Sequence, residues 1–423
     1  MKKKKVFLGI ISSILILAIL YSVAVFSDIP FIKKWRTIYI ETAMTTMTHQ
    51  WLATSFIPGH IVDEVMQDAS KQQEIQQNIE SNWGTTTDIE VTIKDDILIS
   101  NPEETKENVG LDSIPNIGEE NEKQKQEQLL KEAQKEKFFE LYWEVDRDSI
   151  EQYMSANPEA TYDTLLIENL DESIDIKTTF GETIKVLDVK NNLIIVKVTG
   201  EGYSGLLAKS KDPAQITVAK STTLGSAGNL IGKFSKDNNA LVAINASGFA
   251  DENWQGNGGT ITGSMIIDGK DYGNPISWMK LFGFKEDNRM YIENYRQDRV
   301  SQFKWGIQFS PALIVDGEVF VQGSFGYGLQ PRSAVGQTET GEFLMLVIDG
   351  RQPLHSVGAT VGDLSEIMLR HKTYQAMNLD GGSSSVMTYK GETINSPSSK
   401  TKAGRYLPNA FIMKYAEDVA SNG

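Results

Sequence analysis

The chain contains no cysteine among its 423 residues, so it has neither disulfides nor a thiolate site. Its four histidines, His49, His60, His355 and His371, stand apart in the sequence without an HExxH motif or a His-x-His pair. A zinc site is therefore not expected. The Gly-x-Ser-x-Gly element is also absent, which argues against a Ser-His-Asp hydrolase.

Basic residues are in short supply as well. Lys and Arg number 41 against 56 Asp and Glu, which gives a net charge of -15. Residues 61–140 hold 20 acidic and 8 basic residues, so about -12 of the total lies in this one stretch. Nucleic-acid binding requires a concentrated basic face, so no nucleic-acid partner is expected.

The N-terminus carries the long apolar run that the remaining chain lacks. Lys2 to Lys5 precede Val6 to Phe26, whose polar members are only serine, tyrosine and glycine. At about 1.5 Å rise per residue, such a helix covers a hydrocarbon core of roughly 30 Å. No persuasive small-x-small cleavage site follows, so we predict an uncleaved single-pass anchor with the lysines inside and the main domain extracellular. A cysteine-free exported chain suits a bacterial cell surface.

Composition divides the chain into four regions. We predict a cytoplasmic basic tail and transmembrane anchor at 1–27, and a small β-rich segment at 142–200. Between them, residues 28–141 form a stalk with a juxtamembrane helical segment, a polar acidic linker from Ser81 to Glu122, and a charged helix. The main domain is expected at 201–418.

Short β-branched runs separated by turn residues dominate from about Tyr142 onward. Three Asp-Gly steps, at Asp268, Asp316 and Asp349, stand between apolar runs, which is the pattern of hairpin turns. The clearest helix opens at Thr360, with the acid of a capping box three residues later. These signals predict an α+β fold, with a large twisted mixed β-sheet domain and flanking helices.

The run Asn378-Leu379-Asp380-Gly381-Gly382-Ser383-Ser384-Ser385 is the most informative stretch. It places a carboxylate, two glycines and three hydroxyls directly after an apolar strand-like segment. The glycines permit positive φ and a close approach to a ligand, and Asp380 can act as base, nucleophile or metal ligand. The alternative is an ordinary tight turn, with the serines starting the next strand.

Three further polar clusters lie in the same half of the chain. Asn245, in Asn245-Ala246-Ser247-Gly248-Phe249, leaves a strand end and can bind sugar hydroxyls or cap a turn. Gly256 to Gly259 is expected to be a mobile loop, because no Lys-Ser/Thr follows it. Arg332, after Pro331, offers a fork for phosphate or carboxylate oxygens, or a structural salt bridge. Asp349-Gly350-Arg351 fits a site or a third hairpin.

In this order, the clusters resemble the phosphodiester glycosidase family over roughly Gly202 to Lys414. Ser383 stands where the family often has a third glycine, and Ser333 where threonine is common. Both changes keep a compact side chain at the position, although they leave the identity of the substrate undetermined. The matching pieces are the strand-Asn-x-x-Gly-Phe segment ending at Phe249, Pro331 to Gly336, Asp349-Gly350-Arg351, the helix from Thr360, Asn378 to Ser385, and Asn395-Ser396-Pro397-Ser398 with Arg405 and Asn409.

The resemblance implies an enzyme that hydrolyses the bond between a sugar's anomeric carbon and a phosphodiester oxygen. Its substrate would be a glycosyl phosphate or anionic polysaccharide of the cell envelope, as in the exopolysaccharide-related bacterial branch. The phosphate leaving group is already acidic, so charge stabilisation matters more than proton donation.

The expected catalytic residues are Asp380, Asp349 and Arg332. The two acids would divide the base or nucleophile role and oxocarbenium stabilisation, while Arg332 would neutralise the leaving phosphate, with Arg351 as second choice. Which acid attacks depends on their separation in space. No residue is assigned as a metal ligand, although the sequence leaves open a calcium or magnesium ion bound by carboxylates. The cofactor is unknown. The substrate-binding set is Asn245, Arg351, Asn378, Gly381, Gly382, Ser383 and Ser384.

Two other functions compete with this one. The first is a non-catalytic surface module that binds anionic polysaccharide or assists exopolysaccharide assembly, and the second is an envelope scaffold that uses the stalk and anchor. The paired acids Asp349 and Asp380 favour the enzyme, because an anion binder gains nothing from carboxylates beside its ligand. The sugar, the polymer and the oligomeric state are not given by the sequence.

Overall fold

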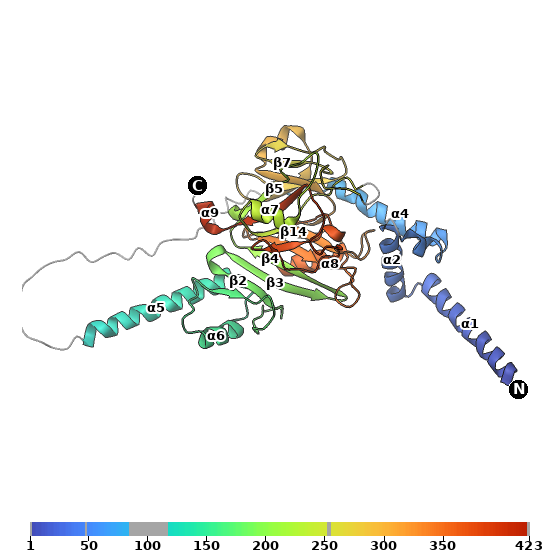
Figure 1. Cartoon of the computed structure of the whole chain (residues 1–423), viewed down its shortest axis with the longest axis horizontal. Coiled ribbons are helices and arrows are strands. Elements are labelled where there is room, and N and C mark those ends of the chain that lie inside the picture. Colours follow the sequence, from blue (N-terminus) through green and yellow to red (C-terminus); the bar gives the residue numbers. More distant parts are fainter. Residues whose placement is uncertain (1, 47–48, 84–116, 252–254, 421–423) are drawn as a thin grey trace, which may run out of the picture. The chain divides into compact units, whose positions relative to one another are not determined.

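The computed structural model describes residues 2–46, 49–83, 117–251 and 255–420 of the chain (Figure 1). Two compact units are present, one made of residues 1–85 and 197–423 and the other of residues 86–196. Most of the expected acidic linker, residues 84–116, lies outside the described residues.

The first unit begins with a series of helices. Within α1, the segment Gly9–Phe26 is long and apolar enough to cross a membrane, so an N-terminal apolar helix is present as expected. A proline at the first turn starts α2, where the missing N–H is not needed. These helices are α1 (Lys2–Phe26), α2 (Pro30–Met44), α3 (Gln50–Thr54) and α4 (Gly59–Ile75).

The unit of residues 86–196 combines helices with a small antiparallel sheet. Helix α6 begins where the Asp146 carboxylate accepts a hydrogen bond from Ser149 N, a standard N-cap. The sequence did not reveal this helix. The elements are α5 (Ile117–Leu141), α6 (Arg147–Ala156), β1 (Leu166–Glu168), β2 (Ile184–Asp188) and the start of β3 (Leu193–Gly200), with β2 pairing antiparallel to both neighbours.

The largest sheet of the first unit carries the polar clusters. Strand β15 is buried at every position, because sheet neighbours and other elements cover both of its faces. Helix α8 (Val361–Arg370) packs against β12, β14 and β16 (Figure 1). Its predicted capping box between Thr360 and Asp363 is confirmed. The antiparallel strand order is β4 (Tyr203–Ser210), β15 (Phe343–Ile348), β14 (Arg332–Thr338), β16 (Thr373–Asn378), β12 (Ala312–Val315) and β13 (Glu318–Val319).

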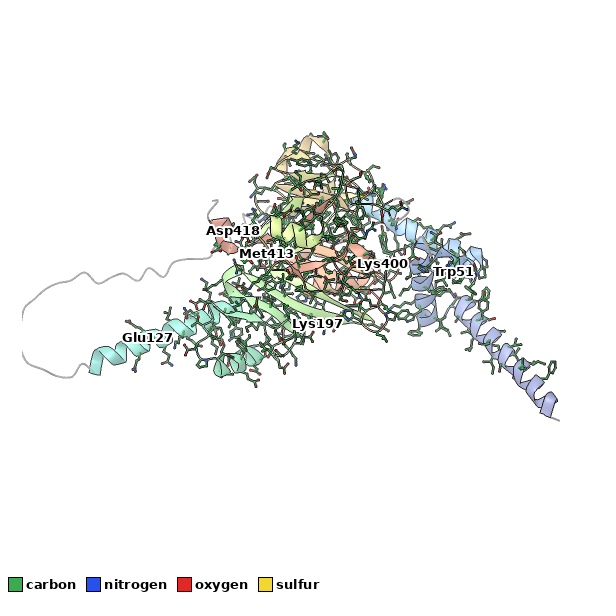
Figure 2. The ribbon with its side chains drawn as sticks, in the orientation of Figure 1. Trp51, Glu127, Lys197, Lys400, Met413 and Asp418 are labelled. Carbon is green, nitrogen blue, oxygen red and sulfur yellow. The ribbon has the colours of Figure 1, made fainter. Side chains whose placement is uncertain are left out.

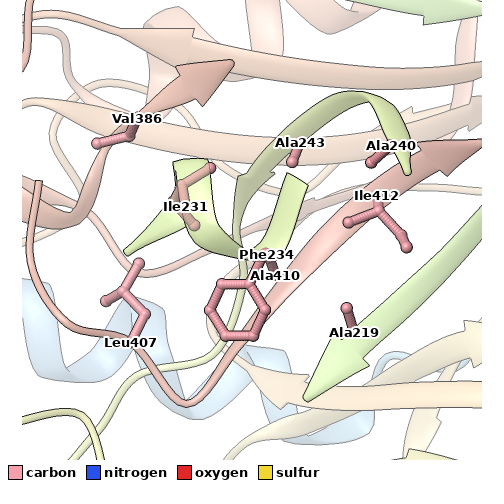
Figure 3. Packing of buried hydrophobic residues seen from close by; sticks show 9 residues of the cluster. All are labelled: Ala219, Ile231, Phe234, Ala240, Ala243, Val386, Leu407, Ala410 and Ile412. Atoms are coloured by element: carbon pink, nitrogen blue, oxygen red, sulfur yellow. The ribbon is translucent and has the colours of Figure 1, made fainter. Parts of the chain in front are cut away.

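Two further antiparallel sheets complete this unit. One runs β18 (Glu392–Thr393), β17 (Met387–Tyr389), β6 (Ala240–Asn245), β19 (Asn409–Lys414) and β5 (Ile216–Lys220). The other runs β10 (Met290–Asn294), β9 (Lys280–Phe284), β11 (Trp305–Phe309), β7 (Met265–Ile267) and β8 (Lys270–Asp271), and the chain continues past β19 into α9 (Ala416–Ala420). Helix α7 (Ile231–Asp237) covers β6, where Phe234 packs among small apolar side chains (Figure 3).

An aromatic core holds the three sheets together. Phe343 of β15 lies 5.4 Å from Phe284 of β9, and Trp305 of β11 lies 5.2 Å from Phe411 of β19, measured between ring centroids. All four rings are buried. Truncating such a ring to alanine typically costs about 3 to 5 kcal/mol, so this core fixes the sheets that carry the polar clusters.

The structure confirms the α+β fold and divides the strands among several antiparallel sheets. The turns at Asp268-Gly269 and Asp316-Gly317 are hairpins in which both residues have positive φ. The hairpin reading of Asp349-Gly350 was wrong. This step ends β15 and begins a loop, because β15 pairs with β4 and β14 on its two sides and not with the segment that follows.

Candidate active site

The register of β14 gathers three polar clusters at one sheet edge. Arg332, the first residue of β14, faces Ile348 at the end of β15, and Ala334 faces Asn378 at the end of β16. Because β14 is antiparallel to both neighbours, its start lies beside both of their ends. The cation and the two carboxylate-bearing segments, far apart in the sequence, therefore meet at this edge.

Close backbone contacts shape the loop that carries Asp380. Gly382 N donates to Pro331 O at 2.8 Å, and a Cβ on Gly381 would lie only 2.7 Å from the same oxygen. Gly382 has a φ of +63°, in the left-handed region that favours glycine. The two glycines are therefore required to bring Asp380 against the start of β14.

Burial raises the pKa of the Asp380 carboxyl to about 6. Hydrogen bonds from the Ser384 side chain and the Gly381 backbone oppose this effect, as does the positive charge of Arg405. Arg405 itself is paired with Asp251 through hydrogen bonds of 2.6 and 2.8 Å. The side chain of Asp380 is only partly buried. Asp380 thus combines partial solvent contact with a raised pKa, which suits acid–base chemistry.

Asn245 ties the Asp380 loop to the second sheet. Its Nδ2 donates to Asp380 O at 2.6 Å, and its Oδ1 accepts from Ser333 Oγ at 2.7 Å. The residue is fully buried. Its amide is thus committed to protein groups and positions the loop, whereas the sequence suggested that it binds a sugar.

Asp349 forms a hydrogen-bonded pair with His355. His355 Nε2 lies 2.8 Å from Asp349 Oδ2, while Oδ1 accepts from Asn395 Nδ2 at 2.8 Å and from Ser396 N at 3.0 Å. Burial raises the pKa of the Asp349 carboxyl, and the hydrogen bond from His355 opposes that shift. The Asp349 side chain is 5% exposed and that of His355 is 42% exposed. The histidine therefore presents the pair to solvent.

Asn395 connects this pair to the Asp380 loop. Besides binding Asp349, its Nδ2 donates to Ser385 O at 3.2 Å, and its Oδ1 accepts from Met387 N. One amide thus touches the carboxylate that follows β15 and the loop that follows β16. Asn395 therefore links Asp349 to the loop that carries Asp380.

Arg332 is buried beneath this edge. Its Nε donates to Ala359 O, and its Nη2 donates to Tyr327 O and Gly328 O at 2.9 and 2.8 Å. Burial lowers the pKa of the guanidinium to about 10, and the positive charge of Arg351 adds to this effect. The carbonyl contacts hold Arg332 in place as a fixed positive charge.

Arg351 lies directly over the Asp380 loop. A Cβ on Gly382 would be 3.3 Å from Arg351 Nη2, and the guanidinium donates from Nε and Nη2 to Gln330 Oε1. Within residues 2–46, 49–83, 117–251 and 255–420, no carboxylate lies within ion-pair distance of it. Burial lowers the pKa of the Arg351 guanidinium. A guanidinium that has no ion pair among these residues and lies over the loop that carries Asp380 is a ready anion site.

The remaining expected residues line the same loop. Asn378 Nδ2 donates to Ser310 O at 2.9 Å, while its buried Oδ1 has no hydrogen-bond partner in the described part of the chain. Ser383 Oγ lies 3.4 Å from Ser398 Oγ and is partly buried. Asn378 Oδ1 thus has no partner among the described residues and the Ser383 hydroxyl has only a long contact, whereas the Ser384 side chain hydrogen-bonds to the Asp380 carboxylate.

Sequence reasoning missed His355 and Gln330 as site residues, and it placed Asn395 in the family resemblance without a role. His355 follows Asp349 by six residues, and Gln330 stands just before Pro331. Neither spacing is a known motif, so only the fold reveals these partners. Among the described residues, no group of three His, Asp or Glu side chains is arranged to hold a metal ion.

Known proteins resemble part of this chain. Residues 238–414 match the phosphodiester glycosidase family, so the resemblance seen in the sequence is confirmed for this segment. The SPbeta prophage-derived uncharacterized protein YomE of Bacillus subtilis (strain 168) is 28% identical over 199 residues, which is 43% of this chain. The match spans only 29% of that protein's length.

Two solved structures align with part of this chain. The catalytic domain of zebrafish N-acetylglucosamine-1-phosphodiester alpha-N-acetylglucosaminidase, auto-inhibited by its pro-peptide, aligns with a TM-score of 0.44 and 21% identity. That alignment covers 53% of this chain and 82% of the zebrafish domain. A hypothetical protein from Synechocystis aligns with a TM-score of 0.44 and 14% identity, covering 56% of this chain and 64% of its own.

Proposed function

We propose that this chain is an extracytoplasmic hydrolase that cleaves the sugar–phosphate bond of a glycosyl phosphodiester in a cell-envelope or exopolysaccharide polymer. The observation that carries the proposal is the position of Arg351. This cation, which has no carboxylate partner in the described part of the chain, lies over the same loop as Asp380, whose pKa of about 6 suits acid–base or nucleophilic chemistry. The family match of residues 238–414 supports the same reaction class.

In the proposed reaction, the bond between the anomeric carbon and the phosphodiester oxygen breaks, and its electron pair stays on the phosphate. The oxygen of a water molecule ends on the anomeric carbon, which yields a free sugar and a phosphomonoester. Arg351 would bind the phosphate and stabilise its growing charge. Arg332, held by three carbonyl groups, would add positive potential from below.

Asp380 is assigned to the anomeric carbon, as nucleophile or as the base that activates water. Its carbonyl is fixed by Asn245 and its carboxylate by Ser384, so the side chain is held before substrate arrives. Ser383, which is partly exposed, would bind a sugar hydroxyl.

Asp349 is assigned a positioning role, because both of its oxygens already accept hydrogen bonds. It would orient the imidazole of His355, as an aspartate does for a catalytic histidine. The partly exposed His355 would then exchange a proton with water or with the departing phosphate.

The experiment uses the full chain in detergent with a sugar-1-phosphate diester, and it measures free reducing sugar and sugar phosphate separately. Reducing sugar should accumulate with the native chain and not with Asp380→Asn. Accumulation of sugar phosphate would reveal cleavage on the other side of the phosphorus. Saturable binding of anionic polysaccharide without any product would instead support the non-catalytic binding module.

A further inference from the structure

An apolar surface surrounds the point where α1 ends. We define this aromatic surface by Phe31, Tyr39, Trp51 and Phe56, which come from α2, α3 and the turn after α3. Their exposed fractions are 69%, 43%, 53% and 55%. Large aromatic side chains gathered in the open indicate a binding partner, because water solvates them poorly.

The aromatic surface is continuous with α1. Tyr21 of α1 donates its hydroxyl to Phe56 O at 2.8 Å. Both residues line one hollow of about 600 Å³, together with Phe31 and Tyr39. Trp51, labelled in Figure 2, has its ring 6.1 Å from that of Phe56. The exposed rings therefore extend directly from the last turns of the apolar helix.

This junction is fixed by hydrogen bonds and by a core of its own. Arg36 Nη1 of α2 donates to Val25 O and Ser27 O at 2.8 and 2.9 Å, which satisfies carbonyl groups at the end of α1. Val25 is also buried in a cluster with Ile40 of α2 and Ile61 of α4. The aromatic surface therefore has a defined position relative to the end of α1.

We propose that the aromatic surface lies in the interfacial layer of a lipid bilayer. Within α1, the Gly9–Phe26 window is 6% buried by protein, so this helix needs an apolar environment along its length. Where such a helix leaves the hydrocarbon core, Trp and Tyr rings are favoured at the level of the headgroups. The exposed Lys33 and Lys34 of α2 suit the phosphates of the same layer.

Direct contacts link these helices to the catalytic part of the unit. Gly326 N donates to Glu41 Oε1 at 3.0 Å, and Leu329 N donates to Thr42 Oγ1 at 2.9 Å. With the aromatic surface in the bilayer, α2 would hold the loop before Arg332 near the membrane. This inference does not depend on the proposed hydrolysis.

The absence of cysteine permits a direct test, because a single introduced thiol can be labelled without background. Phe31→Cys, Trp51→Cys and Phe56→Cys would each carry an environment-sensitive fluorophore in the full chain. The matched control is Trp278→Cys, since Trp278 is also an exposed tryptophan, 52% exposed against 53% for Trp51. The proteins are reconstituted into phosphatidylcholine vesicles with a minor fraction of phosphatidylglycerol and with lipids spin-labelled near the headgroup.

The three labels on the aromatic surface should be quenched severalfold more than the label at position 278, with blue-shifted emission. Equal quenching at all four positions would overturn the proposal. A second copy of the chain is the competing partner. If the blue shift at positions 31, 51 and 56 appears only at high protein-to-lipid ratio, then the surface is an interface between copies and the proposal fails.

Discussion

The substitution Asp380→Asn should stabilise the fold at neutral pH while it abolishes turnover. Burial raises the pKa of Asp380 from 3.8 to about 6, so the ionised carboxylate is held at a free-energy cost. Each unit of pKa corresponds to about 1.4 kcal/mol, and a shift of about two units therefore amounts to about 3 kcal/mol. Because the side chain keeps some solvent contact, this value is an upper limit.

The sign follows from proton linkage. The folded state holds its proton more tightly than the unfolded state, so stability falls as the pH rises from about 4 to about 6. Below about pH 4 the carboxyl is protonated in both states and the cost is absent, whereas above about pH 6 the full cost remains. Asparagine carries no charge at any of these pH values. The gain in free energy of unfolding should thus be near zero at pH 4 and at most about 3 kcal/mol at pH 7.

Urea unfolding of the full chain in detergent, followed by tryptophan fluorescence, measures this difference at the two pH values. Asp251→Asn is the matched control, because the hydrogen bond from Arg405 lowers the pKa of Asp251 and its charge is stabilising. The control should destabilise the chain at pH 7. An Asp380→Asn variant that loses stability at pH 7, or gains equally at both pH values, would refute the reasoning. Sugar release by this variant at the native rate would remove Asp380 from the catalytic set.

Three further predictions concern residues of the same edge. Arg351→Gln should lower kcat by about 10² to 10³ with little change in melting temperature, and a large drop in melting temperature would make this arginine structural. His355→Gln should lower kcat, because Asp349 then holds no group that can exchange a proton with the substrate, whereas an unchanged kcat would exclude a role of His355 in the reaction. Asn245→Ala should cost about 1 to 3 kcal/mol in urea unfolding, because Ser333 Oγ and Asp380 O lose their partner, and a neutral result would contradict its positioning role.

Features encoded locally could be predicted from the sequence. The capping box at Thr360 and the hairpins at Asp268 and Asp316 depend on residues only a few positions apart, and the structure has them as expected. The run from Asn378 to Ser385 also pointed to a shaped loop, because adjacent glycines after a strand have few other uses. Turns, caps and loops that depend on neighbouring residues can therefore be predicted from the sequence.

The partnerships within the site could not be predicted in this way. Arg351 reaches the Asp380 loop because its backbone adopts a φ of +59°, a conformation that an arginine rarely takes. The pairing of Asp349 with His355 depends on the loop after β15, whereas the Asp-Gly step in the sequence is equally typical of a hairpin turn. Asn245 was assigned to substrate because nothing near it in the sequence indicates Ser333 as its partner. The contacts of Asn245 with Ser333 and of Arg351 with the Asp380 loop join segments far apart in the sequence, which local patterns do not encode.

The pairing of β15 with β4 decides which piece of this chain can be produced by itself. The family match begins at residue 238, yet β15 pairs along its whole length with β4, and Asp349 N donates to Ser204 O. A fragment cut at the match boundary would expose one long, entirely apolar strand edge, which is a template for aggregation. Expression fragments intended for crystallisation should therefore retain the residues from Tyr203 onward.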